Sequence, residues 1–120
     1  DDQQSGHRLS IQQFSRIDQS IAHSALFAAF HLNVKALVAL TQSGSTALWM
    51  SRVNAGVPIF ALTPVDETRT KVTLFSGVHP VDFKDTSDDH AMTLRRAEDE
   101  LVRLKQVEEG DLIVMTIGEA

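Results

Sequence analysis

The sequence predicts an α/β fold, a three-layer α/β/α domain on a mostly parallel open sheet. Short apolar runs alternate along the chain with longer amphipathic runs, and polar turns containing glycine or proline separate them. The runs at 36–40 and 112–117 are apolar on both faces, which is typical of strands covered on both sides by helices. Alternation of strands and helices favours parallel pairing, and 120 residues suit one such domain.

A helix is predicted first, from Ser15 to Asn33. Ser15 and Asp18 have the spacing of a capping box, and Asn33 suits the end of a helix. Apolar residues recur between them at helical spacing and make one stripe, which consists of Ile17, Ile21, Ala25, Ala28 and Leu32. We expect residues 1–14 to be a linker or docking segment and residues 15–120 to be the α/β domain.

The middle of the chain predicts two strand–helix units. The segments are strands at 36–40 and 59–62 and helices at 46–53 and 64–76. At the start of the last of these helices, Thr63, Pro64 and Asp66 have the order of an N-cap, a first-turn proline and a first-turn acid. Gly77 is the expected terminator of that helix.

The last third of the chain predicts two more strands and the longest helix. A short strand at 78–81 contains Pro80, which suits the edge of a sheet. The helix is expected at 87–106, and acidic capping charges surround its start: Asp85, Asp88 and Asp89. A strand at 112–117 follows that is apolar except for Thr116, so we expect a further edge strand beside it, from sequence outside these residues or from a partner.

Composition excludes several classes of function. The net charge of −5 gives no basic footprint for nucleic acid. The absence of cysteine excludes disulfides, thiolate chemistry and cysteine-ligated zinc. No apolar run approaches the roughly 20 residues of a membrane span, and the acidic, polar start is unlike a signal peptide. We therefore expect a cytoplasmic protein that binds neither nucleic acid nor membrane.

The most informative segment is the loop between the first predicted strand and the helix after it, which consists of Thr41, Gln42, Ser43, Gly44, Ser45 and Thr46. A helix start leaves about four N–H groups without partners and carries partial positive charge. Gly44 lets the backbone approach closely, and the Ser and Thr hydroxyls can donate and accept. The loop therefore predicts a phosphate site that needs no Lys or Arg.

Two interpretations of this loop stay open. It lacks both the Walker pattern GxxxxGK[ST] and the dinucleotide pattern GxGxxG. Ser and Thr are also preferred N-caps, so a well-capped turn without a ligand is the alternative. Elsewhere, the five histidines lack the spacing of metal ligands and no GxSxG elbow occurs, so neither a metal site nor catalytic residues are predicted. Arg69 and Lys71 are expected on a solvated helix face.

Five segments form a specific combination in a fixed order. They are RIDQSIAHSALFAAFHL (16–32), KALVALTQSGSTALWMSR (35–52), VPIFALTP (57–64), TRTKVTLFSGVHPV (68–81) and GDLIVMTIG (110–118). Together they resemble the C-terminal domain of pyruvate kinase in its bacterial form. The resemblance implies a five-stranded sheet, whose last, antiparallel strand would follow residue 120.

The resemblance also implies a function. Pyruvate kinase transfers phosphate from phosphoenolpyruvate to ADP, giving pyruvate and ATP in glycolysis. Its catalytic barrel, with the magnesium, the potassium and the catalytic lysine, is absent from these residues, so we expect this chain alone to be inactive. In the family the C-terminal domain packs on that barrel, binds allosteric effectors and helps to build a homotetramer.

In the family the effector phosphate sits in the loop that aligns with residues 41–46. Animal forms activated by fructose bisphosphate carry Lys at the position of Gln42, and a neutral Gln removes a charge-assisted contact worth about 1.5–3 kcal/mol. We therefore expect a monophosphate effector, such as ribose 5-phosphate, glucose 6-phosphate or AMP. Two functions stay open: the regulatory and oligomerising domain of pyruvate kinase, or a free-standing phosphate-ligand-binding module of the same fold.

Overall fold

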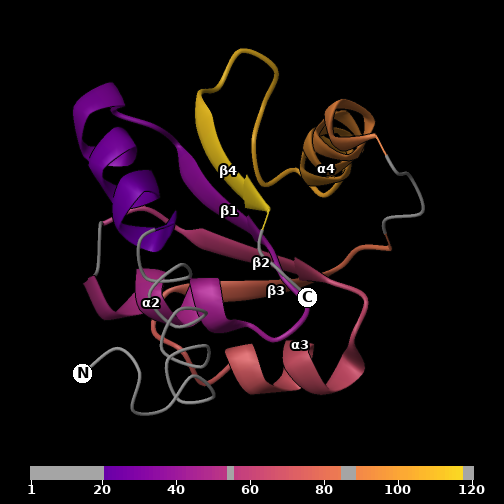
Figure 1. Ribbon diagram of the computed structural model, residues 1–120. Helices are drawn as coiled ribbons and strands as arrows, with labels where there is room; N and C mark the ends of the chain where they lie inside the picture. The colour runs from indigo at the N-terminus through magenta and orange to yellow at the C-terminus, as the bar shows by residue number, and fades with distance from the viewer. Residues whose placement is uncertain (1–20, 54–55, 85–88, 118–120) are drawn as a thin grey trace, which may run out of the picture.

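The computed structural model describes residues 21–53, 56–84 and 89–117, which form one sheet with helices on both faces (Figure 1). Residues 21–32 are helical and come first. The elements that follow are β1 (Ala36–Leu40), α2 (Ser45–Val53), β2 (Ile59–Thr63), α3 (Asp66–Val72), β3 (Val78–Asp82), α4 (His90–Arg103) and β4 (Ile113–Ile117).

The four strands have the order β3-β2-β1-β4, and every neighbouring pair is parallel. Leu37 at the centre of the sheet stands opposite Ile59 of β2 on one side and Val114 of β4 on the other. The predicted parallel open sheet is therefore confirmed. β3 lies at one edge, as Pro80 predicted, and β4 lies at the other edge of the described sheet.

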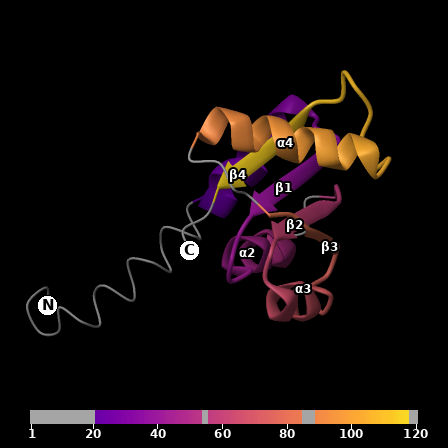
Figure 2. The same cartoon turned by 90° about the vertical axis from the view of Figure 1, so that its right-hand side faces the viewer.

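Two hydrophobic clusters make the three layers. The helix at 21–32, α2 and α3 pack on one face of the sheet, against residues such as Leu37 and Ala39 of β1. α4 covers the other face, against Val38 and Leu40 of the same strand (Figure 2). All five residues of β1 are buried, which explains why its sequence is apolar on both faces.

The first helix buries a different stripe from the one predicted. Leu32 was expected in the stripe, but 56% of its surface is exposed. The residues of this helix that belong to the core are Ala22, Ala25, Leu26 and Ala29. Because three of them are alanines, the helix can lie close to the sheet with this face. Asn33 ends the helix with a φ of +54°, as predicted. Its predicted start at Ser15, Ile17 and the segment 1–14 lie outside the described residues.

α3 is shorter than predicted, at Asp66–Val72 instead of 64–76. The predicted N-cap, Thr63, is the last residue of β2, and its Oγ1 accepts from the Val65 N–H at 3.2 Å, ahead of the helix. Beyond Val72 the N–H groups of residues 73–75 bond to carbonyls three residues back, so the chain leaves the α-helix in a tighter turn.

α4 spans His90–Arg103, so it begins three residues after the predicted start at 87 and ends three residues before the predicted end at 106. Asp89 is its N-cap and accepts from the Ala91 N–H at 3.0 Å, while Asp85, Asp88 and the predicted start at Ser87 lie outside the described residues. The helix ends at Arg103 because Lys105 adopts a φ of +61° and the Gln106 N–H bonds back to the Leu101 carbonyl. This is a Schellman-type end formed without glycine.

Candidate functional site

The loop at 41–46 lies at the point where the order in which the strands are added to the sheet changes direction. It joins β1 to α2, so it sits at the carboxyl end of β1 (Figure 2). β1 has β2 on one side and β4 on the other. The chain leaves β1 toward β2 and returns through α4 to the opposite side. In open α/β sheets, ligands bind at the carboxyl ends of strands at such a point.

Two hydroxyls of the loop accept N–H groups of the loop itself. The Gly44 N–H donates to Thr41 Oγ1 at 2.9 Å, and the Ser45 N–H donates to Ser43 Oγ at 3.2 Å. The Leu48 N–H donates to the Gly44 carbonyl at 2.9 Å and makes the first helical bond of α2. The loop is therefore a capped helix start, and the side-chain oxygens satisfy donors that a helix cannot satisfy by itself.

The six predicted site residues divide by accessibility. The accessible ones are Gln42, Ser43 and Ser45, and the buried ones are Thr41, Gly44 and Thr46. A ligand that approaches from solvent meets the first group. Thr46 is 1% exposed, so its hydroxyl offers a ligand far less than the sequence pattern predicts.

Gly44 packs on α3. It has a φ of +86°, and a β-carbon there would stand 3.1 Å from Cγ1 of Val72 and 3.4 Å from Cγ2 of Thr68. The close approach that glycine permits here is therefore to a helix, whereas the sequence predicted an approach to a ligand. Thr68 also donates from Oγ1 to the Gln42 carbonyl at 2.5 Å, so α3 contacts the loop through both packing and a hydrogen bond.

Arg69 differs from its prediction as a solvated side chain. Its Nη1 donates to the Thr63 carbonyl at 2.8 Å and to Asp82 Oδ1 at 3.1 Å, and its Nη2 pairs with Asp66. Its side chain is 20% exposed. The guanidinium therefore joins α3 to the ends of β2 and β3.

Lys71 is exposed, as predicted, but it also lies beside the loop. Its Cε is 3.6 Å from the position of a β-carbon on Gly44. The loop thus has a flexible cation next to it that sequence reasoning did not assign to the site. Thr68 and Val72 were missed in the same way. Their spacing of one helical turn was the available signal, but nothing in it identified the loop as the partner.

A small cavity adjoins the loop on the α4 side of the sheet. Its volume is about 120 Å³, and its lining comes from the carboxyl ends of the strands: Leu40, Thr41, Gln42, Leu62, Pro64, Phe83 and Ile117. An apolar surface and the two polar loop residues Thr41 and Gln42 therefore meet in this cavity, at the point where the strand order changes direction.

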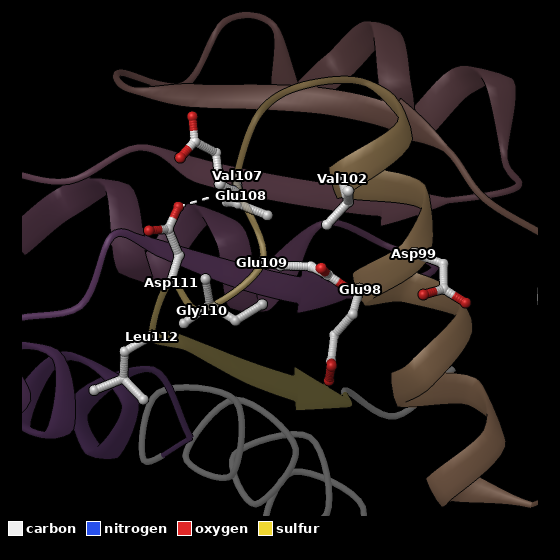
Figure 3. A pocket seen from close by; sticks show the side chains of 10 residues that line it. Glu98, Asp99, Val102, Val107, Glu108, Glu109, Gly110, Asp111 and Leu112 are labelled. Carbon is white, nitrogen blue, oxygen red and sulfur yellow. Dashed lines mark hydrogen bonds between the residues drawn. The ribbon is translucent and has the colours of Figure 1, made fainter.

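A larger cavity of about 410 Å³ lies elsewhere, between the end of α4 and the segment before β4 (Figure 3). Its lining is rich in carboxylates, among them Glu98 and Asp99 of α4 and Glu108 and Asp111 of the segment before β4. The Glu108 N–H donates to Asp111 Oδ2 at 2.8 Å. These charges repel phosphate, so this cavity is no candidate for the predicted ligand. Within 21–53, 56–84 and 89–117, no three His, Asp or Glu side chains group in a way that could hold a metal ion.

Comparisons with known proteins agree on one family. A family model described as pyruvate kinase, alpha/beta domain, matches residues 19–120. Pyruvate kinase II of Salmonella typhimurium is 39% identical over 116 residues, which are 96% of this chain and 24% of that protein. A pyruvate kinase of Staphylococcus aureus is 41% identical over 99 residues, 82% of this chain and 16% of that protein.

A solved structure shares the fold. The crystal structure of Cryptosporidium parvum pyruvate kinase superposes with a TM-score of 0.75 at 22% identity, over 84% of this chain and 21% of that one. The chain thus spans a quarter or less of the length of each of these three relatives. In the described part of the chain, none of the helices has the length and apolarity needed to cross a membrane.

Proposed function

Because this chain belongs to the pyruvate kinase α/β domain family, we propose that it is the regulatory, effector-binding and oligomerising domain of a pyruvate kinase. The parent enzyme would convert phosphoenolpyruvate and ADP to pyruvate and ATP. The share of each relative that the chain spans supports a role as one domain of such an enzyme. Its magnesium, potassium and catalytic residues would then belong to the remaining three quarters.

The observation that carries the effector role is the geometry of the loop. Gln42, Ser43 and Ser45 are accessible at the start of α2, where the helix dipole favours an anion. Lys71 lies close enough to add a flexible positive charge, and the cavity beside Gln42 has room for part of a ligand beyond its phosphate. These features support a phosphate monoester of a sugar or nucleoside, such as ribose 5-phosphate, glucose 6-phosphate or AMP.

The surface of the first helix supports the oligomerising role. Phe27 is 66% exposed, Phe30 87% and Leu32 56%. The rings of Phe27 and His31 stack with centroids 4.1 Å apart, so the aromatic side chains form one exposed group. Two large apolar side chains three residues apart, here Phe27 and Phe30, share one exposed helix face, which is typical of a protein–protein contact. A second subunit and the catalytic barrel are the two partners we propose for it.

Calorimetric titration of the chain with ribose 5-phosphate, glucose 6-phosphate and AMP tests the effector role. We expect at least one to bind. The double variant Ser43→Ala, Ser45→Ala should weaken that binding, whereas Ser24→Ala, an exposed serine of the first helix, should leave it unchanged. Absence of binding by all three compounds, or equal binding by the double variant, contradicts the site.

The parent enzyme separates the two functions that the sequence left open. In a regulatory domain, the double variant should abolish an allosteric coupling of about 1–3 kcal/mol while activity at saturating phosphoenolpyruvate persists. A free-standing module would bind the ligand with no catalytic domain to respond. The open reading frame that contains these residues would show directly whether they belong to a pyruvate kinase or to a free-standing module.

A further inference from the structure

The hydroxyl of Thr68 reaches the most accessible part of the loop. Thr68 is 5% exposed, and its Oγ1 donates to the Gln42 carbonyl at 2.5 Å. The two residues are 26 positions apart, so the bond joins α3 to the loop across a long stretch of chain. One turn later on the same face, Val72 faces Gly44. The buried face of α3 therefore contacts the loop at two points.

α3 is held in place without help from the loop. Arg69 donates to the Thr63 carbonyl at the end of β2 and to the Asp82 carboxylate at the end of β3. The helix is thus fixed to two strands of the sheet. A contact between a fixed helix and a short loop determines the conformation of the loop, because the loop has fewer supports of its own.

The Thr68 bond also determines which way one peptide group faces. All peptide bonds of the described residues are trans, so the Gln42 carbonyl and the Ser43 N–H of their shared peptide group point to opposite sides. With the carbonyl turned toward Thr68, the Ser43 N–H points away from α3. No acceptor among the described residues bonds this N–H, and Ser43 is exposed. An N–H facing a ligand attracts an anion, whereas a carbonyl in its place repels one.

We propose that Thr68 is a positioning residue that holds the Gln42–Ser43 peptide with its N–H outward and so makes the loop receptive to a phosphate monoester. The nature of the ligand rests on the proposed function, but the orientation of the peptide does not. Without the Thr68 hydroxyl the carbonyl loses its donor and the peptide is free to turn over. The outward group then becomes an oxygen.

The test compares three variants of this chain. Thr68→Val removes the hydroxyl and keeps the shape, and Thr68→Ser keeps the hydroxyl. Thr70→Val is the matched control, because Thr70 lies on the exposed face of the same helix. Amide exchange at Gly44 and Ser45, whose N–H groups are bonded inside the loop, should rise about fivefold or more in Thr68→Val relative to β1, and less than about twofold in the other two variants.

Ligand binding gives the second readout. Affinity for AMP and for inorganic phosphate should fall about fivefold or more in Thr68→Val and stay near that of the unmodified chain in Thr68→Ser. Unchanged exchange at Gly44 and Ser45 in Thr68→Val overturns the proposal. Exchange that rises equally across β1 and β2 also overturns it, because Thr68 would then support the fold in general. If the loop responds as expected but the unmodified chain binds no phosphate compound, the positioning of the peptide stands and the proposed effector site is wrong.

Discussion

A β-carbon on Gly44 would stand 3.1 Å from Cγ1 of Val72, so the start of α2 packs on α3 through a residue without a side chain. Gly44 also has a φ of +86°, a conformation that residues with a β-carbon adopt at a cost. Backbone conformation and packing therefore select glycine independently at this position.

Gly44→Ala should lower the free energy of unfolding by about 2–5 kcal/mol, because a left-handed residue costs about 1–2 kcal/mol and a clash in a packed region about 1–3 kcal/mol. Gly77→Ala is the matched control, since Gly77 has a φ of +73° and no atom within 4 Å of its β-carbon position. Its cost should be about 1–2 kcal/mol. Urea denaturation measures both, and equal losses in the two variants would show that the contact with Val72 costs nothing.

The order and type of the elements could be predicted because local signals agree with the fold. Each of these signals lies within or next to the element that it predicts: the apolar runs in β1 and β2, and the aspartate before α4. The errors lie where distant residues decide. Leu32 fits a helical stripe, but the sheet meets the face one position away. α3 stops at Val72 although the sequence continues with helix-compatible residues, because hydrogen bonds to carbonyls three residues back replace the helical ones.

The candidate loop could be located from sequence because a strand end, hydroxyl residues and a helix start follow one another without a gap. Its surroundings could not. Thr68 and Lys71 reach the loop only because α3 crosses back beside α2 after β2, and nothing local encodes that placement. The solvent accessibility of the loop residues could not be predicted for the same reason. Thr46 and Ser43 look equivalent in the sequence, yet one is buried and the other exposed.

The surface pair at the end of α4 predicts a small pH effect. Arg103 donates from Nε to Glu100 Oε1 at 3.0 Å and from Nη2 to Oε2 at 2.6 Å. These hydrogen bonds, and with them the positive charge of Arg103, lower the pKa of the Glu100 carboxyl below its ordinary value. A carboxyl with a lowered pKa in the folded state stabilises the fold above its unfolded pKa, and this contribution is lost as pH falls through the folded pKa.

Arg103→Gln should therefore raise the pKa of Glu100 toward its ordinary value, which an NMR titration of the side chain measures directly. Arg95→Gln, an exposed arginine on the same helix, should leave that pKa unchanged. A Glu100 titration that does not move in Arg103→Gln contradicts the pairing. The loss of stability should be small, because exposed ion pairs contribute little.

The isolated chain should show no phosphate transfer from phosphoenolpyruvate to ADP. Phosphoryl transfer requires metal ions held beside the nucleotide phosphates, and the described residues offer no group of ligands for one. A coupled assay of pyruvate formation on the purified chain measures this. A preparation made in parallel from host cells that do not express the chain controls for enzyme carried over from the host. Turnover by the chain above that of this preparation would contradict the prediction.

The chain should self-associate through the exposed aromatic group of its first helix. Phe27 and Phe30 expose 66% and 87% of their surface, and covering such side chains stabilises a contact by roughly 25 cal/mol per Å² of apolar area. Light scattering behind a sizing column, at concentrations of tens of micromolar, should give a mass above that of one chain. The double variant Phe27→Ser, Phe30→Ser should shift that mass to the monomer, because both side chains lie outside the core and their loss leaves the fold intact.

Leu74→Ser is the control that distinguishes a specific contact from nonspecific hydrophobic association. Leu74 is 85% exposed, as much as Phe30, but it follows α3 on another part of the molecule. Its replacement should leave the mass unchanged if the first helix makes the contact. An equal effect of Leu74→Ser would mean that any exposed apolar residue promotes association. A monomeric unmodified chain would remove the first helix as a subunit contact within this domain and leave the catalytic barrel as its proposed partner.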